Sequence, residues 1–222
     1  MKTLKLNFAS ILLATAIGLG GIAGLDPSGI TAVAAAQAKG MDAQSDLRLA
    51  LNQLLAEHVG LAAAATDAAL GGRTKEFKAA AAALDANSQD IAKAIGSVYG
   101  QAAGDAFLPL WRKHIGFFVD YTMATAKGNK KGQDKAVNDL VQYAQDFGAF
   151  INSASPGLPK EAVAGLVKMH ALGLKAVIDA QATHNETLAF EKLREATHHM
   201  QMIADPLAAT IVAQFPDKFP AM

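Results

Sequence analysis

The sequence predicts an all-α protein, a six-helix bundle built from three helical hairpins of a repeat of about 56 residues. Helix-forming Ala, Leu, Gln, Lys and Glu fill long stretches, and the period-2 alternation of half-buried strands is missing. Turn-forming residues interrupt these stretches at regular intervals. A leucine is followed four residues later by a histidine three times at constant spacing, at Leu54/His58, Leu110/His114 and Leu166/His170.

The N-terminal segment has the pattern of a signal peptide. Lys2 and Lys5 precede an apolar run over residues 8–25, and small residues around 36–38 resemble a cleavage site. A retained membrane anchor is the alternative, because the run is close to the length that spans a bilayer. We expect residues 1–38 to be a signal peptide that directs the protein to the cell surface or the exterior.

The rest of the chain is long enough for one domain with a substantial core. We expect a short linker over 39–44 and a single helical-bundle domain over 45–219. The mature region contains no further stretch long and apolar enough to cross a membrane.

The first hairpin is predicted over 45–98. Its helices are expected near 44–70 and 75–97, separated by Gly71-Gly72, with Thr74 as the N-cap of the second helix.

The second hairpin is predicted over 101–154. Its helices are expected near 102–127 and 132–153, separated by the segment 128–132, which begins and ends with glycine. Pro109 should kink or begin the first of them, because proline lacks the N–H that a helix interior requires.

The third hairpin is predicted over 159–215. Its helices are expected near 159–183 and 186–214, separated by His184-Asn185, with Asn185 as the N-cap.

Large aromatic residues gather in the middle hairpin, and we interpret them as the packing core of the bundle. A binding pocket for an aromatic ligand is the alternative interpretation. Each aromatic side chain can bury roughly 150–250 Å². The residues are Phe107, Trp111, Phe117, Phe118, Tyr143 and Phe150.

Composition excludes several classes of function. Without residues 1–38, which contain Lys2, Lys5 and Asp26, the chain keeps 18 of its 20 basic and 19 of its 20 acidic residues, so nucleic acid is not expected as a partner. The absence of cysteine excludes a lipoprotein anchor, disulfides, thiolate metal sites and covalent haem. Phosphate-binding loops, zinc-protease motifs and nucleophile elbows are also missing, so we do not expect an enzyme.

The repeated histidines are predicted to face the second helix of their own hairpin. An antiparallel turn about 15 residues after each histidine places His58 opposite Asn87 and Asp90, and His114 opposite Tyr143 and Asp146. We interpret His58–Asp90 and His114–Asp146 as structural pairs, because a buried imidazole needs a hydrogen-bond partner. A proton-linked or hard-metal site is the alternative, since a neighbouring carboxylate raises imidazole basicity.

The third hairpin differs, because its histidine lies opposite His199 and Met202 instead of an acid. His198 and Met202 are four residues apart on one predicted helix face. Imidazole and thioether together suit copper, and the soft sulfur favours Cu(I). The sequence therefore offers a candidate copper site at His170, His199, Met202 and His198, with Met169 nearby. Packing of methionine in the core is the alternative.

The chain lacks the ligands that a di-iron helical bundle requires. That site needs a Glu-x-x-His motif on each of two helices, and this chain has a single match, Glu195 to His198.

Three segments resemble a known group of proteins. The segments 52–62 (NQLLAEHVGLA), 111–121 (WRKHIGFFVDY) and 211–219 (IVAQFPDKF) are similar to secreted, mostly uncharacterised helical proteins of Gram-positive spore-forming bacteria. Those proteins are often labelled "copper amine oxidase N-terminal domain-containing" through a fused domain that is missing here. The resemblance covers nearly the whole mature chain and implies an exported all-helical module. It implies no oxidase, because the Asn-Tyr-Asp/Glu sequence that forms the quinone cofactor is absent.

We therefore expect an exported, non-enzymatic helical bundle that binds an unidentified protein or cell-envelope partner. A copper-binding protein with its site in the third hairpin is the alternative.

Overall fold

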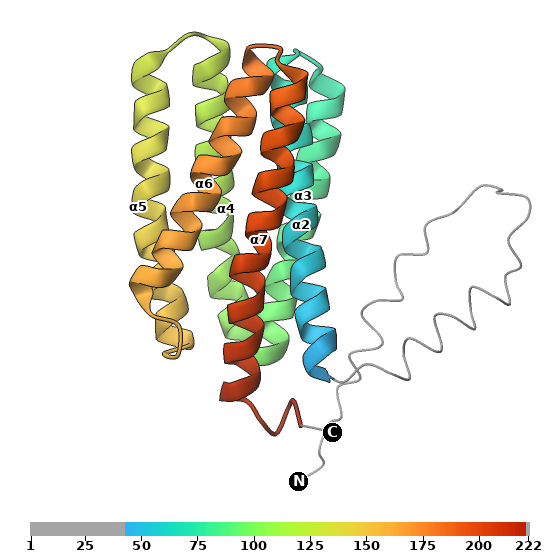
Figure 1. Ribbon diagram of the computed structural model, residues 1–222, viewed down its shortest axis with the longest axis vertical. Helices are drawn as coiled ribbons and strands as arrows, with labels where there is room; N and C mark the ends of the chain where they lie inside the picture. The colour runs from blue at the N-terminus through green and yellow to red at the C-terminus, as the bar shows by residue number, and fades with distance from the viewer. Residues whose placement is uncertain (1–42, 221–222) are drawn as a thin grey trace, which may run out of the picture.

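The computed structural model describes residues 43–220, and these residues fold into six helices that form one bundle (Figure 1). The predicted fold class is confirmed, and each predicted helix boundary lies within two residues of the observed one. The helices are α2 (Ala43–Leu70), α3 (Thr74–Tyr99), α4 (Gln101–Ala126), α5 (Lys130–Ala154), α6 (Lys160–Ala182) and α7 (Glu186–Gln214). The predicted signal peptide, residues 1–38, lies outside the described residues, and α2 already includes the last two residues of the predicted linker.

The three hairpins form a closed ring with approximate threefold symmetry. Helices α2, α4 and α6 pack against one another in the centre, and α3, α5 and α7 each lie in the groove between two of them. The three hairpin turns lie together at the upper end in Figure 1, so the inner helices run parallel and the outer helices run antiparallel to them. Equivalent positions of the repeat therefore meet at the centre of the bundle.

The hairpin turns share one backbone conformation. Gly72, Gly128 and His184, each 56 residues from the next, have φ angles of 67°, 62° and 54°. This left-handed region is open to glycine and costs other residues free energy. The third turn thus uses a histidine where the other two use glycine.

The helix caps after these turns also follow the repeat. The side chains of Asn129 and Asn185 accept hydrogen bonds from the backbone N–H groups of Gly132 and Leu188, each at 3.1 Å. Asn185 is therefore the cap that the sequence predicts. In the first hairpin the cap position is Arg73, which makes no side-chain cap bond. The predicted cap at Thr74 is wrong by one residue, because the threonine is already the first residue of α3.

Two glycines allow adjacent hairpins to approach closely. A Cβ atom added to Gly104 on α4 would lie 2.7 Å from the carbonyl oxygen of Ala92 on α3. A Cβ atom on Gly148 of α5 would lie 2.5 Å from the carbonyl oxygen of Lys160 on α6. The ring closes between α2 and α7, where Arg48 donates to Asp205 through Nε at 2.8 Å.

Pro109 lies inside α4, which begins earlier at Gln101, so the proline does not begin that helix.

Within residues 43–220, no helix combines the length and the hydropathy that a membrane span requires.

The core follows the central axis in layers of three residues, one from each inner helix. All members of these layers are buried. In order along the axis the layers are Leu51/Phe107/Val163, Leu55/Trp111/Val167, His58/His114/His170, Ala62/Phe118/Leu174 and Thr66/Thr122/Ile178. The predicted aromatic core is confirmed for Phe107, Trp111, Phe118 and Tyr143, whereas Phe117 and Phe150 are only partly buried.

Candidate metal centre

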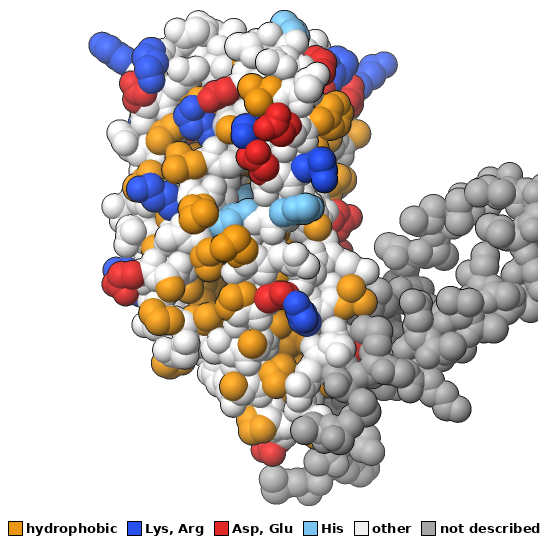
Figure 2. All heavy atoms as spheres, viewed as in Figure 1, with side chains coloured by type: hydrophobic (Ala, Val, Ile, Leu, Met, Phe, Trp, Pro, Cys, Tyr) orange, Lys and Arg blue, Asp and Glu red, His pale blue; other side chains and the backbone are white. Residues whose placement is uncertain are grey.

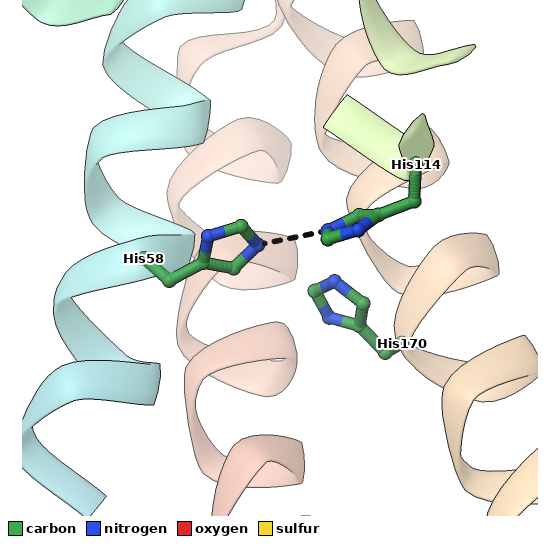
Figure 3. A group of neighbouring side chains, drawn as sticks. All are labelled: His58, His114 and His170. Atoms are coloured by element: carbon green, nitrogen blue, oxygen red, sulfur yellow. Dashed lines mark hydrogen bonds between the residues drawn. The ribbon is translucent and has the colours of Figure 1, made fainter. Parts of the chain in front are cut away.

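The middle layer of the axis consists of three histidines. His58, His114 and His170 come from α2, α4 and α6, and their rings point toward one another (Figure 3). Their exposed fractions are 1 %, 2 % and 4 %, so the histidines are almost completely shielded from bulk solvent. The repeat places them there, because equal positions on three parallel inner helices meet at one height on the axis.

The spacing of the ring nitrogens is close to that of a metal site. One nitrogen from each ring lies within 4.8 Å of the others, and the Nε2 atoms of His58 and His114 are 3.3 Å apart. An ion bound to nitrogen at ~2.0–2.1 Å holds its ligand atoms about 3.3–3.6 Å apart in tetrahedral or trigonal geometry. One edge of the triangle already has this length, and the other ligand atoms need to move by little more than 1 Å.

The protein itself does not satisfy these nitrogens. Apart from the contact between His58 and His114, their ring nitrogens have no hydrogen-bond partner: Nδ1 of His58, Nδ1 of His114 and both nitrogens of His170 are unpaired. A buried polar atom without a partner costs about 1–3 kcal/mol. Four such atoms in one layer make the cluster a candidate site for a ligand that accepts or replaces these contacts.

Burial also keeps the imidazoles neutral. Burial, followed by the charges of His114 and His170, lowers the pKa of His58 far below its ordinary value of 6.5. Burial and then the charge of His170 lower the pKa of His114 to about 3, and the nearby backbone of Trp111, which does not meet hydrogen-bond geometry at Nδ1, has a smaller opposite effect. Burial and then His199 lower the pKa of His170 to about 4. At neutral pH each ring therefore keeps one lone-pair nitrogen, which is the state that binds a metal, and an ion would replace the contact between His58 and His114.

The residue 29 positions after each histidine supports the inner helix. Asn87 donates to the carbonyl oxygen of Leu54 at 3.0 Å, and His199 Nε2 donates to the equivalent carbonyl of Leu166 at 2.8 Å. In the middle hairpin this position is Tyr143, whose ring lies 5.0 Å from that of His114. The hairpin register predicted from the sequence is thus close to the observed one.

The predicted histidine–acid pairs are not formed. Asp90 is exposed and accepts from Lys93, and Asp146 is exposed and accepts from Gln142. Asp90 and Asp146 lie three residues after the buried Asn87 and Tyr143, about 60° around the helix from them, and this offset places the two acids at the exposed edge of the buried face. His58 and His114 instead turn toward the central axis and contact each other.

The predicted copper ligands of the third hairpin divide between core and surface. His170 is buried in the central layer, whereas Met202 is 53 % exposed and His198 is also exposed. His199 is half-buried and its Nε2 binds the Leu166 carbonyl. Met169 is exposed as well. Of this set, the structure brings His170 alone into the three-histidine layer.

Sequence reasoning considered His58 and His114 as ligands only in its alternative, a hard-metal site beside their acidic neighbours, and did not bring the three histidines together. The signal for them was present, since three polar residues at one register of a threefold repeat meet when the repeat closes into a ring. That closure depends on contacts between hairpins, which pairing within a hairpin does not reveal.

Comparison of the chain with models of protein families, with curated proteins and with solved structures found no match.

Proposed function

We propose that this protein binds one transition-metal ion, copper or zinc, at the three-histidine layer on the axis of the bundle. The observation that carries the proposal is the convergence of three buried imidazoles whose ligand atoms lie within 4.8 Å of one another. The unpaired ring nitrogens support it, because coordination would satisfy them.

The donor set favours a borderline ion over a hard one. Imidazole nitrogen suits zinc, copper, iron and nickel, whereas calcium and magnesium prefer oxygen. The three-histidine group, as found in the part of the chain that the structure describes, includes no carboxylate. Divalent copper binds nitrogen sites more tightly than zinc does, so we expect copper to displace zinc in a direct competition.

Three protein ligands leave a coordination position open. Structural zinc sites are closed by four protein ligands, whereas sites with three histidines keep a place for an exogenous ligand. The protein is then a metal-binding helical module. The proposed site on the bundle axis replaces the copper site that the sequence suggested in the third hairpin.

The signal-like N-terminal segment supports export of this module to the cell surface or beyond, where it would meet a protein or cell-envelope partner. N-terminal sequencing of the protein from the producing cell's exterior should find a start near residue 39. An intact N-terminus in a cytoplasmic fraction would overturn export.

Metal titration of the metal-free protein tests the proposed site. We expect one Cu²⁺ or Zn²⁺ per chain after gel filtration and elemental analysis, and paramagnetic resonance of the copper form should show coupling to imidazole nitrogens. His58→Ala, His114→Ala and His170→Ala should each weaken uptake strongly. His198→Ala and Met202→Leu are the matched controls on the surface and should leave uptake unchanged.

A lack of stoichiometric uptake by the folded wild-type protein would overturn the proposal. So would uptake that depends on Met202 or His198 and persists in folded variants of the axial histidines. The resonance spectrum of the wild-type protein keeps the test decisive where an alanine variant does not fold.

A further inference from the structure

A cavity of about 70 Å³ lies beside the histidine layer. A water molecule needs only ~10–15 Å³ on this measure, so the space suits a ligand of several atoms. His114 and His170 form part of its wall, and most of the remaining wall is aliphatic or aromatic, including Leu55, Phe147 and Met200.

Four residues of this wall carry polar side-chain atoms that are buried without a partner. They are Trp111 at Nε1, Tyr143 at its hydroxyl, and the two histidines. The ring centroids of Trp111 and Tyr143 lie 4.7 Å and 5.0 Å from that of His114, so both side chains pack directly against a proposed ligand. Unpaired buried donors are rare in proteins, and their collection around one space indicates a ligand that accepts hydrogen bonds.

The opposite side of the histidine layer offers less, because among the residues that border its cavity His58 alone carries an unpaired side-chain atom, Nδ1. The smaller cavity there, of about 30 Å³, is bordered by His58, Thr66 and Thr122. Both hydroxyls are satisfied, because Thr66 donates to the Ala63 carbonyl at 3.0 Å and Thr122 to the Phe118 carbonyl at 2.8 Å. Of these two cavities, the larger one therefore offers the donors of Trp111 and Tyr143 to a ligand of the ion, in addition to its histidines.

The charge of the site determines the class of ligand. A divalent ion with three neutral imidazoles carries two positive charges into an apolar core, and an uncompensated buried charge is strongly unfavourable. The cluster itself supplies no anion. An anion from solvent would reduce the charge and accept the free hydrogen bonds together.

We propose that a small inorganic anion of two or three heavy atoms binds in this cavity, at the open coordination position of the ion. Trp111 Nε1–H and Tyr143 O–H donate hydrogen bonds to it. This inference rests on the proposed metal site, and it names the ligand that completes that site.

The wall of the cavity includes residues of α6 and α7 that lie near the surface. Its wall includes Pro206, which is exposed, and the partly exposed Leu158 and Ile203. Figure 2 shows apolar side chains around a hollow on this face, below the pale-blue histidines. A small anion can therefore arrive without unfolding of the inner helices.

Azide titration of the copper-loaded protein tests the inference. We expect a saturable ligand-to-metal charge-transfer band and a changed paramagnetic resonance spectrum at one azide per copper. Tyr143→Phe and Trp111→Phe should each weaken azide binding about three- to tenfold, the loss of one hydrogen bond, while copper uptake stays the same. Tyr121→Phe is the matched control, because that hydroxyl binds Asp179 outside the cavity.

The outcomes separate the two proposals. Stoichiometric copper uptake without azide binding overturns the anion site and leaves the metal site standing, as does azide binding that is equally strong in both donor variants. Failure of the protein to take up copper or zinc overturns the metal site itself, and the anion site with it.

Discussion

The Nε2 atoms of His58 and His114 lie 3.3 Å apart on the axis of the bundle, although 56 residues separate them in the chain. One neutral ring can donate to the other across this distance, but His170 beside them has no hydrogen bond at either nitrogen. The metal-free core is therefore an unfavourable arrangement that a bound ion would relieve.

Acid should destabilise the metal-free protein. Burial lowers the pKa of His114 to about 3 and that of His170 to about 4, and it lowers the pKa of His58 as well. Below the unfolded pKa of about 6.5 the unfolded chain binds protons that the folded chain does not, so stability falls as pH falls from that value toward the folded pKa values. Each imidazole contributes up to about 1.4 kcal/mol per pH unit.

Urea unfolding of the metal-free chain between pH 7.5 and 4.5 measures this loss. His198→Leu, which removes an exposed histidine, should give the wild-type pH profile. Equal stability of the wild-type protein at pH 7 and pH 5 would contradict the predicted neutral cluster.

Apolar residues at the axis should stabilise the metal-free protein. The triple variant His58→Leu, His114→Leu and His170→Leu replaces every member of the layer by a side chain of similar volume. No unpaired ring nitrogen then remains in the layer. Replacement of both partners of a buried polar contact by apolar groups of the same shape is nearly neutral or stabilising. We expect a higher urea midpoint at pH 7, a flatter pH profile below it, and no metal uptake. A lower midpoint for the folded triple variant would show that the histidines stabilise the core without a metal.

Metal should restore the stability that the histidines cost. An ion that binds only the folded chain stabilises it by about 2.7 kcal/mol when its free concentration is 100 times the dissociation constant. For a domain of this size that corresponds to a rise in melting temperature of about 5–11 °C. Thermal unfolding with and without Zn²⁺ measures it. The triple leucine variant is the control, and an equal rise in that variant would place the ion elsewhere.

Glycine in the third turn should stabilise the fold. His184 has a φ of 54°, the conformation that Gly72 and Gly128 adopt at the equivalent positions. The left-handed region costs a non-glycine residue roughly 1–2 kcal/mol, and the larger unfolded-state entropy of glycine offsets part of the gain. We expect His184→Gly to raise the free energy of unfolding by about 0.5–1 kcal/mol. The reciprocal variant Gly128→Ala should lower it, and a matching loss in His184→Gly would contradict the shared turn geometry.

The sequence was sufficient for the helices and their hairpins, because turn residues and caps act locally. Asn185 and the glycines in the first two hairpin turns are readable without tertiary contacts. The direction in which the histidine rings point could not be predicted in the same way. His58 lies opposite Asn87 in its own hairpin, yet its ring turns toward His114 of the next one. Pairing rules within a hairpin miss this, because the angle at which three hairpins close depends on the small residues where they cross.

Replacement by alanine should have opposite effects at two glycines of α4, of which only the first lies at a crossing with another helix. A Cβ atom on Gly104 of α4 would lie 2.7 Å from the Ala92 carbonyl oxygen, a backbone atom that cannot rotate away. Gly104→Ala should therefore separate α3 from α4 and cost about 1–3 kcal/mol, as overpacking of a tight interface does. Gly116 lies on the exposed face of the same helix with open space around its Cβ position. Gly116→Ala should stabilise the protein by up to about 1 kcal/mol, because alanine favours a helix interior more than glycine does.

Urea unfolding of the two variants separates helix propensity from packing. A change in propensity alone would shift both midpoints upward, whereas the close crossing moves them in opposite directions. Copper uptake should also differ between the two variants. Displacement of α4 at Gly104 tilts the helix that carries His114, so the ligand triangle opens, and Gly116→Ala leaves it intact. If Gly104→Ala kept both its stability and its copper affinity, the crossing would not determine the position of His114.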